Sequence, residues 1–229
     1  MRIEHGVGVE GARRATGVVV VIDVLRAFTV SAFAFAGGAR DCLLVPTVEE
    51  ARELAVSTPG SVISAESDGL PIPGIAISNS PTQISETDVL GKSLIQRTSA
   101  GTPVINAVRA DLNVYAASLV VAGATAQACL LTQADTATLV ASADFPEDHA
   151  CARYIEDRIQ GRQPNLDDLL APLYASERYQ RFAAGGWPGF PPTDLELALM
   201  PDRFDFVMQA TRQGGHIRLK ARRSVERLA

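Results

Sequence analysis

Five consecutive apolar residues, Val18–Ile22, constrain the fold of this chain more than any other feature. All five are β-branched, and β-branched side chains favour extended backbone. A continuous apolar run of strand length is typical of a strand buried on both faces of a sheet, as in α/β proteins. The Ala- and Phe-rich segment Ala27–Ala36 follows and predicts a buried helix, which should end at the glycine pair Gly37-Gly38.

Strand-like and helix-like segments alternate through most of the remaining chain. The further predicted strands are Cys42–Val45, Ser61–Ala65, Ser93–Arg97, Leu119–Ala122 and Thr136–Ala141. This alternation predicts an α/β architecture. The 229 residues can bury a full core, and we expect a single domain over residues 1–229. Because strand–turn–helix units recur, two similar halves are also compatible with the pattern.

Two local patterns predict helix caps, and a third predicts a hairpin. Thr47 is followed three residues later by Glu50, and Thr193 by Glu196. This is the spacing of a capping box, so each Thr is predicted to cap a helix. The segments Arg203–Met208 and His216–Leu219, on either side of Gly214-Gly215, predict a closing β-hairpin.

The composition excludes several classes of protein. The formal net charge is −5 and the pI is near 5.3, so the chain lacks the basic footprint of a nucleic-acid-binding protein. No apolar run approaches the roughly 20 residues of a membrane helix, and the N-terminus lacks the apolar core of a signal peptide. The cysteines show no metal-ligand spacing and are expected to be reduced and buried; they are Cys42, Cys129 and Cys151. We expect a cytoplasmic protein without nucleic-acid or membrane partners.

The residues that follow the first strand are the strongest candidates for a functional site. Asp23 stands where the apolar run ends, and Arg26 follows at the start of the predicted helix. Open α/β sheets bind ligands at the carboxyl ends of their strands, and a helix N-terminus favours an anion. A carboxylate and a guanidinium here could hold a metal ion and an oxyanion side by side. The alternative is an Asp that caps the helix and pairs with a surface Arg.

Polar residues follow two further predicted strands. Glu66 and Asp68 enter a glycine loop, and such carboxylates suit Mg²⁺, with an ordinary polar turn as the alternative. The segment Arg97–Thr102 places hydroxyls and a glycine between a strand and a helix, which is the composition of an anion-binding turn. It lacks the lysine and the spacing of a P-loop, so nucleotide binding is not indicated.

Four other segments are weaker candidates. Ile77–Pro81 contains Asn and Ser side chains that hydrogen-bond locally in turns. Gly123–Thr125 could donate backbone N–H groups to a ligand. Glu147–His149 begins a helix, where acidic residues also favour the helix dipole. Trp187 in its Gly/Pro loop either anchors a lid or packs in the core or at an interface.

Taken in order, these motifs resemble one family, the 2-phosphosulfolactate phosphatases of coenzyme M biosynthesis and their bacterial relatives. The resemblance covers nearly the whole chain and rests on Val20–Ala27, Gly69–Pro81, Gly91–Thr102, Glu147-Asp148 and Asp202–Val207. It implies a three-layer α/β/α fold with a mixed sheet. It also implies Mg²⁺-dependent hydrolysis of a phosphate ester on a small anionic acid.

The resemblance and the residue chemistry together assign roles. Asp23 and Glu66 would hold Mg²⁺ directly or through water, and Arg26 would clamp the phosphate. Asp148 is a candidate general acid or base, and direct attack by water and a phospho-enzyme at Asp23 both stay open. The candidate substrate-binding residues are Asn79, Ser80, Arg97, Thr98, Ser99, Gly101 and Thr102.

The chain departs from the family pattern at three positions. Ser67 stands where the family often has a second arginine, Ala100 where it often has Asn, and Phe28 where a hydroxyl residue is usual. The rival hypothesis is a non-catalytic protein that binds an anionic phosphometabolite in the same pocket, and a third is a hydrolase or lyase of another class. The apolar segment Ala27–Ala36 packs either in the core or at a homodimer interface.

Overall fold

Strand β2 (Val18–Ile22) lies inside the sheet, and all five of its residues are buried. It pairs in parallel with β7 (Asn113–Ala117) on one side and with β8 (Thr136–Ala141) on the other. A strand that is covered on both edges and both faces leaves no solvent for polar side chains, which explains its continuous apolar run.

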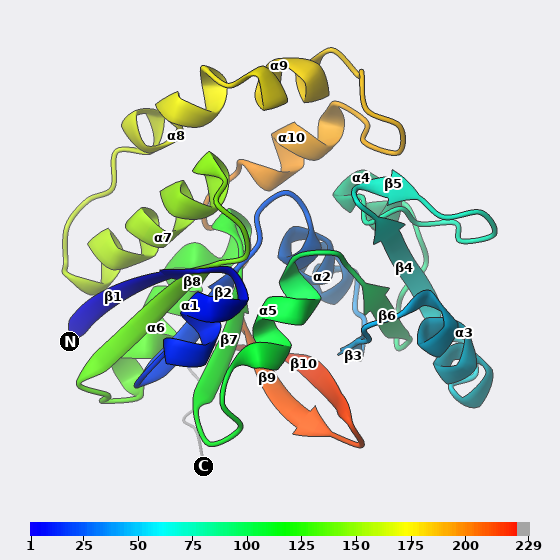
Figure 1. Ribbon diagram of the computed structural model, residues 1–229, viewed down its shortest axis with the longest axis horizontal. Coiled ribbons are helices and arrows are strands. Elements are labelled where there is room, and N and C mark those ends of the chain that lie inside the picture. Colours follow the sequence, from blue (N-terminus) through cyan, green and yellow to red (C-terminus); the bar gives the residue numbers. More distant parts are fainter. Residues whose placement is uncertain (224–229) are drawn as a thin grey trace.

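The computed structural model of the chain describes residues 1–223, and its strands form a ten-stranded mixed sheet (Figure 1). The last six residues of the predicted domain 1–229 lie outside the described part. The other strands are β1 (Arg2–Val7), β3 (Asp41–Leu44), β4 (Val62–Ser67), β5 (Leu70–Pro71), β6 (Ser93–Arg97), β9 (Phe206–Gln213) and β10 (His216–Arg223). The helices are α1 (Gly8–Arg14), α2 (Ala27–Ala36), α3 (Val48–Ser57), α4 (Pro81–Ser85), α5 (Gly101–Ala107), α6 (Ala122–Leu131), α7 (Pro146–Ile159), α8 (Leu166–Tyr174), α9 (Glu177–Ala183) and α10 (Thr193–Ala198).

Two groups of parallel strands make up most of the sheet. One contains β1, β8, β2 and β7, and the other contains β3, β6 and β4. The antiparallel hairpin β9–β10 joins them, since β9 pairs with β7 and β10 pairs with β3. The two groups therefore run in opposite directions along the sheet.

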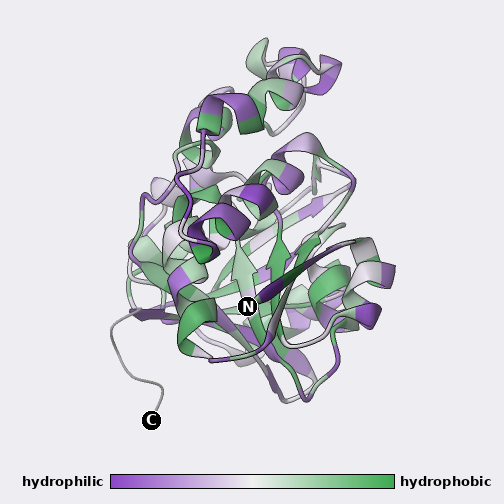
Figure 2. Ribbon diagram, turned by 90° about the vertical axis from the view of Figure 1, so that its left-hand side faces the viewer, coloured by the Kyte–Doolittle hydropathy of each residue, from purple (hydrophilic) through white to green (hydrophobic). Residues whose placement is uncertain are grey.

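Helices cover both faces of this sheet. Val19 and Val21 of β2 point to one face and pack with α1, α2 and α5, whereas Val18, Val20 and Ile22 point to the other and pack with α6 and α7. The second parallel group repeats this arrangement with α3 on its outer face. Hydrophobic residues follow the central strands, and hydrophilic residues lie on the outer turns of the helices (Figure 2). These layers confirm the predicted α/β/α fold with a mixed sheet.

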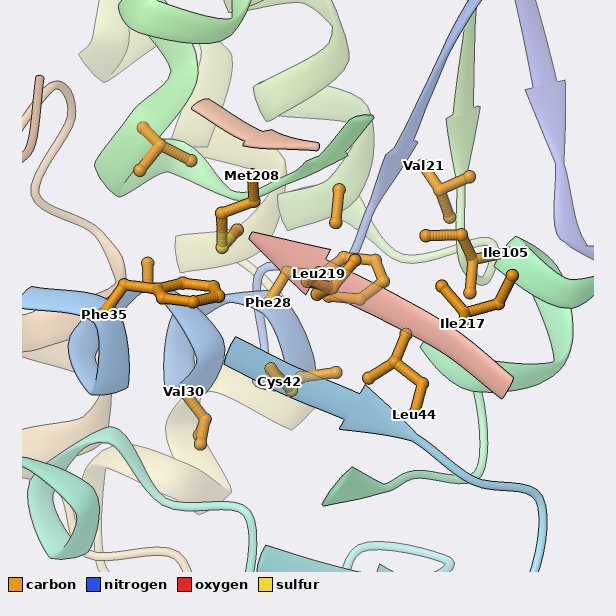
Figure 3. Packing of buried hydrophobic residues seen from close by; sticks show 14 of the residues in the cluster. Val21, Phe28, Val30, Phe35, Cys42, Leu44, Ile105, Met208, Ile217 and Leu219 are labelled. Atoms are coloured by element: carbon orange, nitrogen blue, oxygen red, sulfur yellow. The ribbon is translucent and has the colours of Figure 1, made fainter. Parts of the chain in front are cut away.

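Helix α2 is buried within the chain. Nine of its ten residues are buried, and Phe28 and Phe35 lie close to the side chains of Cys42 and Leu219 in the same cluster (Figure 3). The helix therefore packs in the core, which was one of the two alternatives for this segment. A homodimer stays a prediction.

Some local predictions are wrong. Leu119–Ala122 is not a strand: Leu119–Val121 is a 3₁₀ turn, and α6 begins at Ala122. Periodicity cannot distinguish a short apolar strand from a buried helical turn. Thr47 caps α3 as predicted, accepting a hydrogen bond from Glu50 N (3.1 Å). Thr193 does not cap α10, because the helix begins at Thr193 itself and its hydroxyl contacts that of Thr82 (2.7 Å).

Helices α8, α9 and α10 form an arch, residues 166–198, beyond the carboxyl ends of β2 and β8 (Figure 1). Phe182, Phe190 and Leu195 form its small apolar core, against which Trp187 packs. None of the helices in residues 1–223 combines the length and apolarity needed to cross a bilayer. The arch is important because it closes one side of the cavity described next.

Candidate active site

A cavity of about 350 Å³ lies between the arch and the carboxyl ends of β2, β4 and β6. The two parallel groups of strands run in opposite directions, yet both contribute to it; the twist of a wide sheet allows such convergence. The residues that line it are Asp23, Leu25, Arg26, Glu66, Asp68, Gly69, Asn79, Thr98, Ser99, Ala100, Phe145, Arg178, Phe182, Trp187 and Phe190.

Asp23 follows directly after β2 and is buried. Its Oδ1 accepts a hydrogen bond from Ala27 N (2.9 Å), so the carboxylate is held at the first turn of α2. The pKa of Asp23 is raised to about 6, chiefly by burial and in smaller part by the nearby carboxylates of Glu66 and Glu147, while the hydrogen bond from Ala27 N lowers it. A buried carboxylate beside another carboxylate is a site that a cation would stabilise.

Glu66 lies near the end of β4 and faces the same cavity. Its Oε1 accepts from Ser99 N (2.5 Å), and its Oε2 accepts from Gly69 N (2.6 Å) and from the Ser99 hydroxyl (3.2 Å). These donors come from two different loops. The carboxylate of Glu66 is therefore fixed before any ligand arrives.

The predicted pair Asp23 and Glu66 fits Mg²⁺. In residues 1–223 no three His, Cys, Asp or Glu side chains cluster as metal ligands. Mg²⁺ does not need such a cage, because it is usually held by one or two carboxylates and by substrate phosphate while it keeps several waters. Two carboxylates in one cavity meet that requirement.

Arg26 is buried under the arch rather than exposed, so the alternative of a surface Arg is wrong. Its NH1 donates to Asp194 Oδ2 (2.7 Å) and to Gly189 O (2.7 Å), and its NH2 donates to Ser78 O (3.2 Å). The ring of Phe190 lies 4.2 Å from the guanidinium carbon. A guanidinium has five N–H donors, so these three bonds leave donors for an anion in the cavity.

Asn79 lines the cavity, and its contact with Gln96 determines which end of its amide group is free to bind a ligand. Gln96 Nε2 donates to Ala27 O (2.9 Å), which can only accept, so this atom is the amide nitrogen. The Asn79 atom that the same nitrogen contacts (3.0 Å) must then be the acceptor Oδ1. The Nδ2 group of Asn79 is left for a ligand, which fits the predicted role in anion binding.

The residues of the segment Arg97–Thr102 differ in their relation to the cavity: some line it, and others support the residues that do. Thr98 and Ser99 line the cavity. Thr102 supports Thr98, since their hydroxyls lie 3.0 Å apart and Thr102 N donates to Thr98 Oγ1 (3.1 Å). Arg97 does not line the cavity; its NH1 donates to Glu66 O and to the Ser99 hydroxyl. Arg97 thus holds the two loops that position Glu66.

Three other predicted residues, Ser80, Gly101 and Asp148, also lie outside the lining. Ser80 caps α4 and donates to Asp194 Oδ1 (2.7 Å). Asp148 is buried and accepts from Val24 N (2.8 Å), Ser142 N (3.2 Å) and the Ser142 hydroxyl (2.9 Å). Burial raises its pKa well above the ordinary range, with Asp23 and Glu147 adding to the effect. Asp148 therefore ties α7 to the ends of β2 and β8, one step away from the cavity.

Several cavity residues had no signal in the sequence patterns. Four of them are Arg178, Phe145, Phe182 and Phe190. They belong to helices and loops whose sequence patterns indicate only packing against the core. Trp187 lines the cavity and its Nε1 donates to Gly69 O (3.1 Å), so its loop is tied to the loop of Glu66. The weak candidates Gly123–Thr125 lie in the first turn of α6, where Gly123 N donates to Asp202 Oδ1 (2.6 Å).

Gly101 shapes the site through its missing side chain. A β-carbon at this position would come within 2.9 Å of Asp23 Oδ2 and 3.2 Å of Ala27 Cβ. We expect Gly101→Ala to destabilise the protein by about 1–3 kcal/mol, because a packed site has no room for the methyl group. Chemical unfolding of the two proteins would measure this loss, and a change below about 0.5 kcal/mol would contradict the close packing.

Comparisons with known proteins show which family the chain is similar to. A family model described as 2-phosphosulpholactate phosphatase matches residues 8–212. A protein of Bacillus subtilis strain 168 named "Probable 2-phosphosulfolactate phosphatase" is 32% identical over 200 residues, which cover 85% of this chain and 87% of that protein. A protein of the same name from Symbiobacterium thermophilum is 31% identical over 170 residues, which cover 72% of this chain and 73% of that protein.

Proposed function

The chain belongs to the 2-phosphosulpholactate phosphatase family, and we propose that it is a Mg²⁺-dependent phosphatase that hydrolyses a phosphate monoester of a small anionic acid, such as 2-phosphosulfolactate. The observation that carries the proposal is the convergence of two carboxylates and one arginine, Asp23, Glu66 and Arg26, in a single cavity.

The side chains of the cavity suit this reaction. Arg26 and the amide group of Asn79 offer donors to phosphate oxygens, and the hydroxyls of Thr98 and Ser99 add polar contacts beside them. Donors fixed in advance stabilise the charge that spreads over the phosphoryl oxygens in the transition state. The apolar rings of the arch keep water away from the rest of the substrate.

Asp23 and Glu66 would hold Mg²⁺ in the cavity. When bound, Mg²⁺ supplies positive charge to the transferring phosphoryl group and orients it. Asp23 holds its position through Ala27 N, and Glu66 holds its position through Ser99 and Gly69. Because both carboxylates are held by these hydrogen bonds, Mg²⁺ would bind between two ligands whose positions are already fixed.

Release of phosphate by the purified protein tests the proposal directly. The substrates are 2-phosphosulfolactate and an aryl phosphate, each with Mg²⁺ and with a chelator. Turnover that requires Mg²⁺ supports the proposal. Binding of phosphate analogues without turnover of either substrate would favour the rival, a non-catalytic anion-binding protein.

Binding of Mg²⁺ is expected to weaken as the pH falls through about 6. The pKa of Asp23 is about 6, and the carboxylate must lose its proton before it can bind a metal. We expect the apparent Kd for Mg²⁺ to rise about tenfold for each pH unit below 6 and to be nearly constant above 7. The single tryptophan, Trp187, lines the cavity, so its fluorescence can follow the titration. A Kd that is independent of pH between about 5 and 8 would contradict the assignment of Asp23.

A further inference from the structure

A second arginine faces the cavity from the arch. Arg178 lies on α9 and lines the cavity together with the rings of Phe145 and Phe182. Its guanidinium carbon is 3.8 Å from the ring centre of Phe145 and 4.8 Å from that of Phe182. The rings hold the planar group in place, and stacking of this kind leaves the edge of the guanidinium for hydrogen bonds.

The only acidic partner that Arg178 has within residues 1–223 is Glu147. Its NH2 lies 3.2 Å from Glu147 Oε1, but the contact is not aligned as a hydrogen bond, and both buried oxygens of Glu147 lack a hydrogen-bond donor in the described part. Arg178 Nε is also buried without a partner there. The Arg178 side chain is 27% exposed and lines the cavity, so part of it stays accessible to a ligand there while NH2 faces Glu147.

The position of Arg178 differs from that of Arg26. Arg26 belongs to the β2–α2 junction that also holds Asp23, whereas Arg178 belongs to the arch and stands among aromatic walls. Rings suit the carbon skeleton of a substrate, and a guanidinium beyond them suits a second oxyanion, since its fork can bind a carboxylate or a similar group with two hydrogen bonds.

We propose that Arg178 binds the second anionic group of the substrate, the carboxylate or sulfonate that the phosphate ester carries, and so selects acid phosphates over neutral phosphate monoesters. This inference rests on the proposed function, because it names the substrate class of the same cavity. It assigns the phosphate to the end of the cavity with Arg26 and the acid group to the end with Arg178.

Replacement of Arg178 by Gln tests the assignment. We expect kcat/KM to fall about 30- to 100-fold for a 2-phosphooxy carboxylate such as phosphoglycolate, mainly through KM, as for the loss of one charge-assisted pair. The same variant should change kcat/KM for an aryl phosphate by less than about threefold. An equal fall for both substrates would overturn the proposal, because Arg178 would then bind the phosphate itself.

Controls separate binding from folding. Arg178→Gln leaves Glu147 without its charged partner, so the double variant Glu147→Gln/Arg178→Gln keeps the pair neutral and should show the same selective loss. Arg153→Gln, on the exposed face of α7, should leave both substrates unaffected. If the double variant regains full activity on the acid phosphate, Arg178 has only a structural role and the proposal is wrong.

A binding measurement distinguishes this inference from the proposed function. The fluorescence of Trp187 can report binding of a 2-hydroxy acid, the product without its phosphate, in the presence of Mg²⁺. We expect wild-type binding that weakens at least tenfold in Arg178→Gln. This result would support the second anion site even if no phosphate ester were hydrolysed, and equal binding by both proteins would reject the site even if hydrolysis were observed.

Discussion

Replacement of Asp23 by Asn is expected to lower kcat/KM by about 10²- to 10³-fold without loss of the fold. An amide is a poorer ligand for Mg²⁺ than a carboxylate, and the charge that holds the ion beside the phosphate would be halved. Loss of one fixed electrostatic contact in an active site typically costs about 10²- to 10³-fold. Phosphate release at saturating Mg²⁺, with circular dichroism to confirm folding, measures the effect.

The same substitution should stabilise the metal-free protein at neutral pH. The pKa of Asp23 is raised from 3.8 to about 6 in the folded protein, so the folded state holds this proton more tightly than the unfolded chain. The stabilising contribution is fully present below about pH 4 and is lost as the pH rises through 6. Above that pH the buried charge costs stability, and Asn carries no such charge. Thermal unfolding with a chelator should show a gap that favours the variant and is wider at about pH 8 than at pH 5.

Addition of Mg²⁺ should reverse this order. A ligand that binds only the folded state raises its stability, so Mg²⁺ should raise the Tm of the wild type and leave that of Asp23→Asn nearly unchanged. Asp144→Asn is the matched control, since Asp144 is an exposed carboxylate in the loop after β8. If Asp23→Asn keeps both activity and the response to Mg²⁺, Asp23 has no role in metal binding.

The core of the site could be predicted because its signals are local. Asp23 follows a strand whose burial is evident from five apolar residues, and Arg26 lies one short turn beyond it. Glu66 and Thr98 likewise follow strands. Parallel strands bring such junctions to one edge of a sheet, so each group of strands could be expected to collect its own polar residues. The approach of Asp23 to Glu66 could not be predicted in this way, because β2 and β4 belong to groups that run in opposite directions.

The partners of these residues could not be predicted, because they come from remote segments. Asp194 and Gly189 reach Arg26 from the arch, and Arg178 enters the cavity from the same segment. An acidic residue in the first turn of a helix has an ordinary explanation in the helix dipole, so Asp194 carried no signal of its own. How the arch folds over the sheet is decided by tertiary packing.

Several predicted site residues lie close to the cavity without lining it. Turn composition and the family resemblance predict roles for Ser80, Arg97, Thr102 and Asp148, but the structure places these four residues behind the lining as supports. Each hydrogen-bonds to a neighbouring loop or helix end. Position along the chain identifies a segment, but the direction of each side chain depends on backbone geometry that sequence patterns do not resolve.

Replacement of Asp194 by Ala is expected to destabilise the protein by about 3–5 kcal/mol and to abolish most activity. Asp194 is fully buried; its Oδ2 accepts from Arg26 NH1 (2.7 Å), and its Oδ1 accepts from the Ser80 hydroxyl (2.7 Å) and Thr82 N (3.0 Å). Loss of one partner leaves a buried charge uncompensated, which is the costly case for an internal ion pair. Chemical unfolding and phosphate release measure the two effects.

A second pair of variants separates stability from catalysis at this ion pair. The double variant Arg26→Met/Asp194→Leu removes both charges and should recover much of the lost stability, because well-packed apolar residues often replace a buried pair at little cost. Its activity should stay low, since Arg26 is proposed to bind the phosphate. Glu196→Gln, an exposed position on the same helix α10, should change neither quantity. If the double variant is as active as the wild type, Asp194 and Arg26 serve only to attach the arch to the sheet, and the phosphate must be bound by other donors of the cavity.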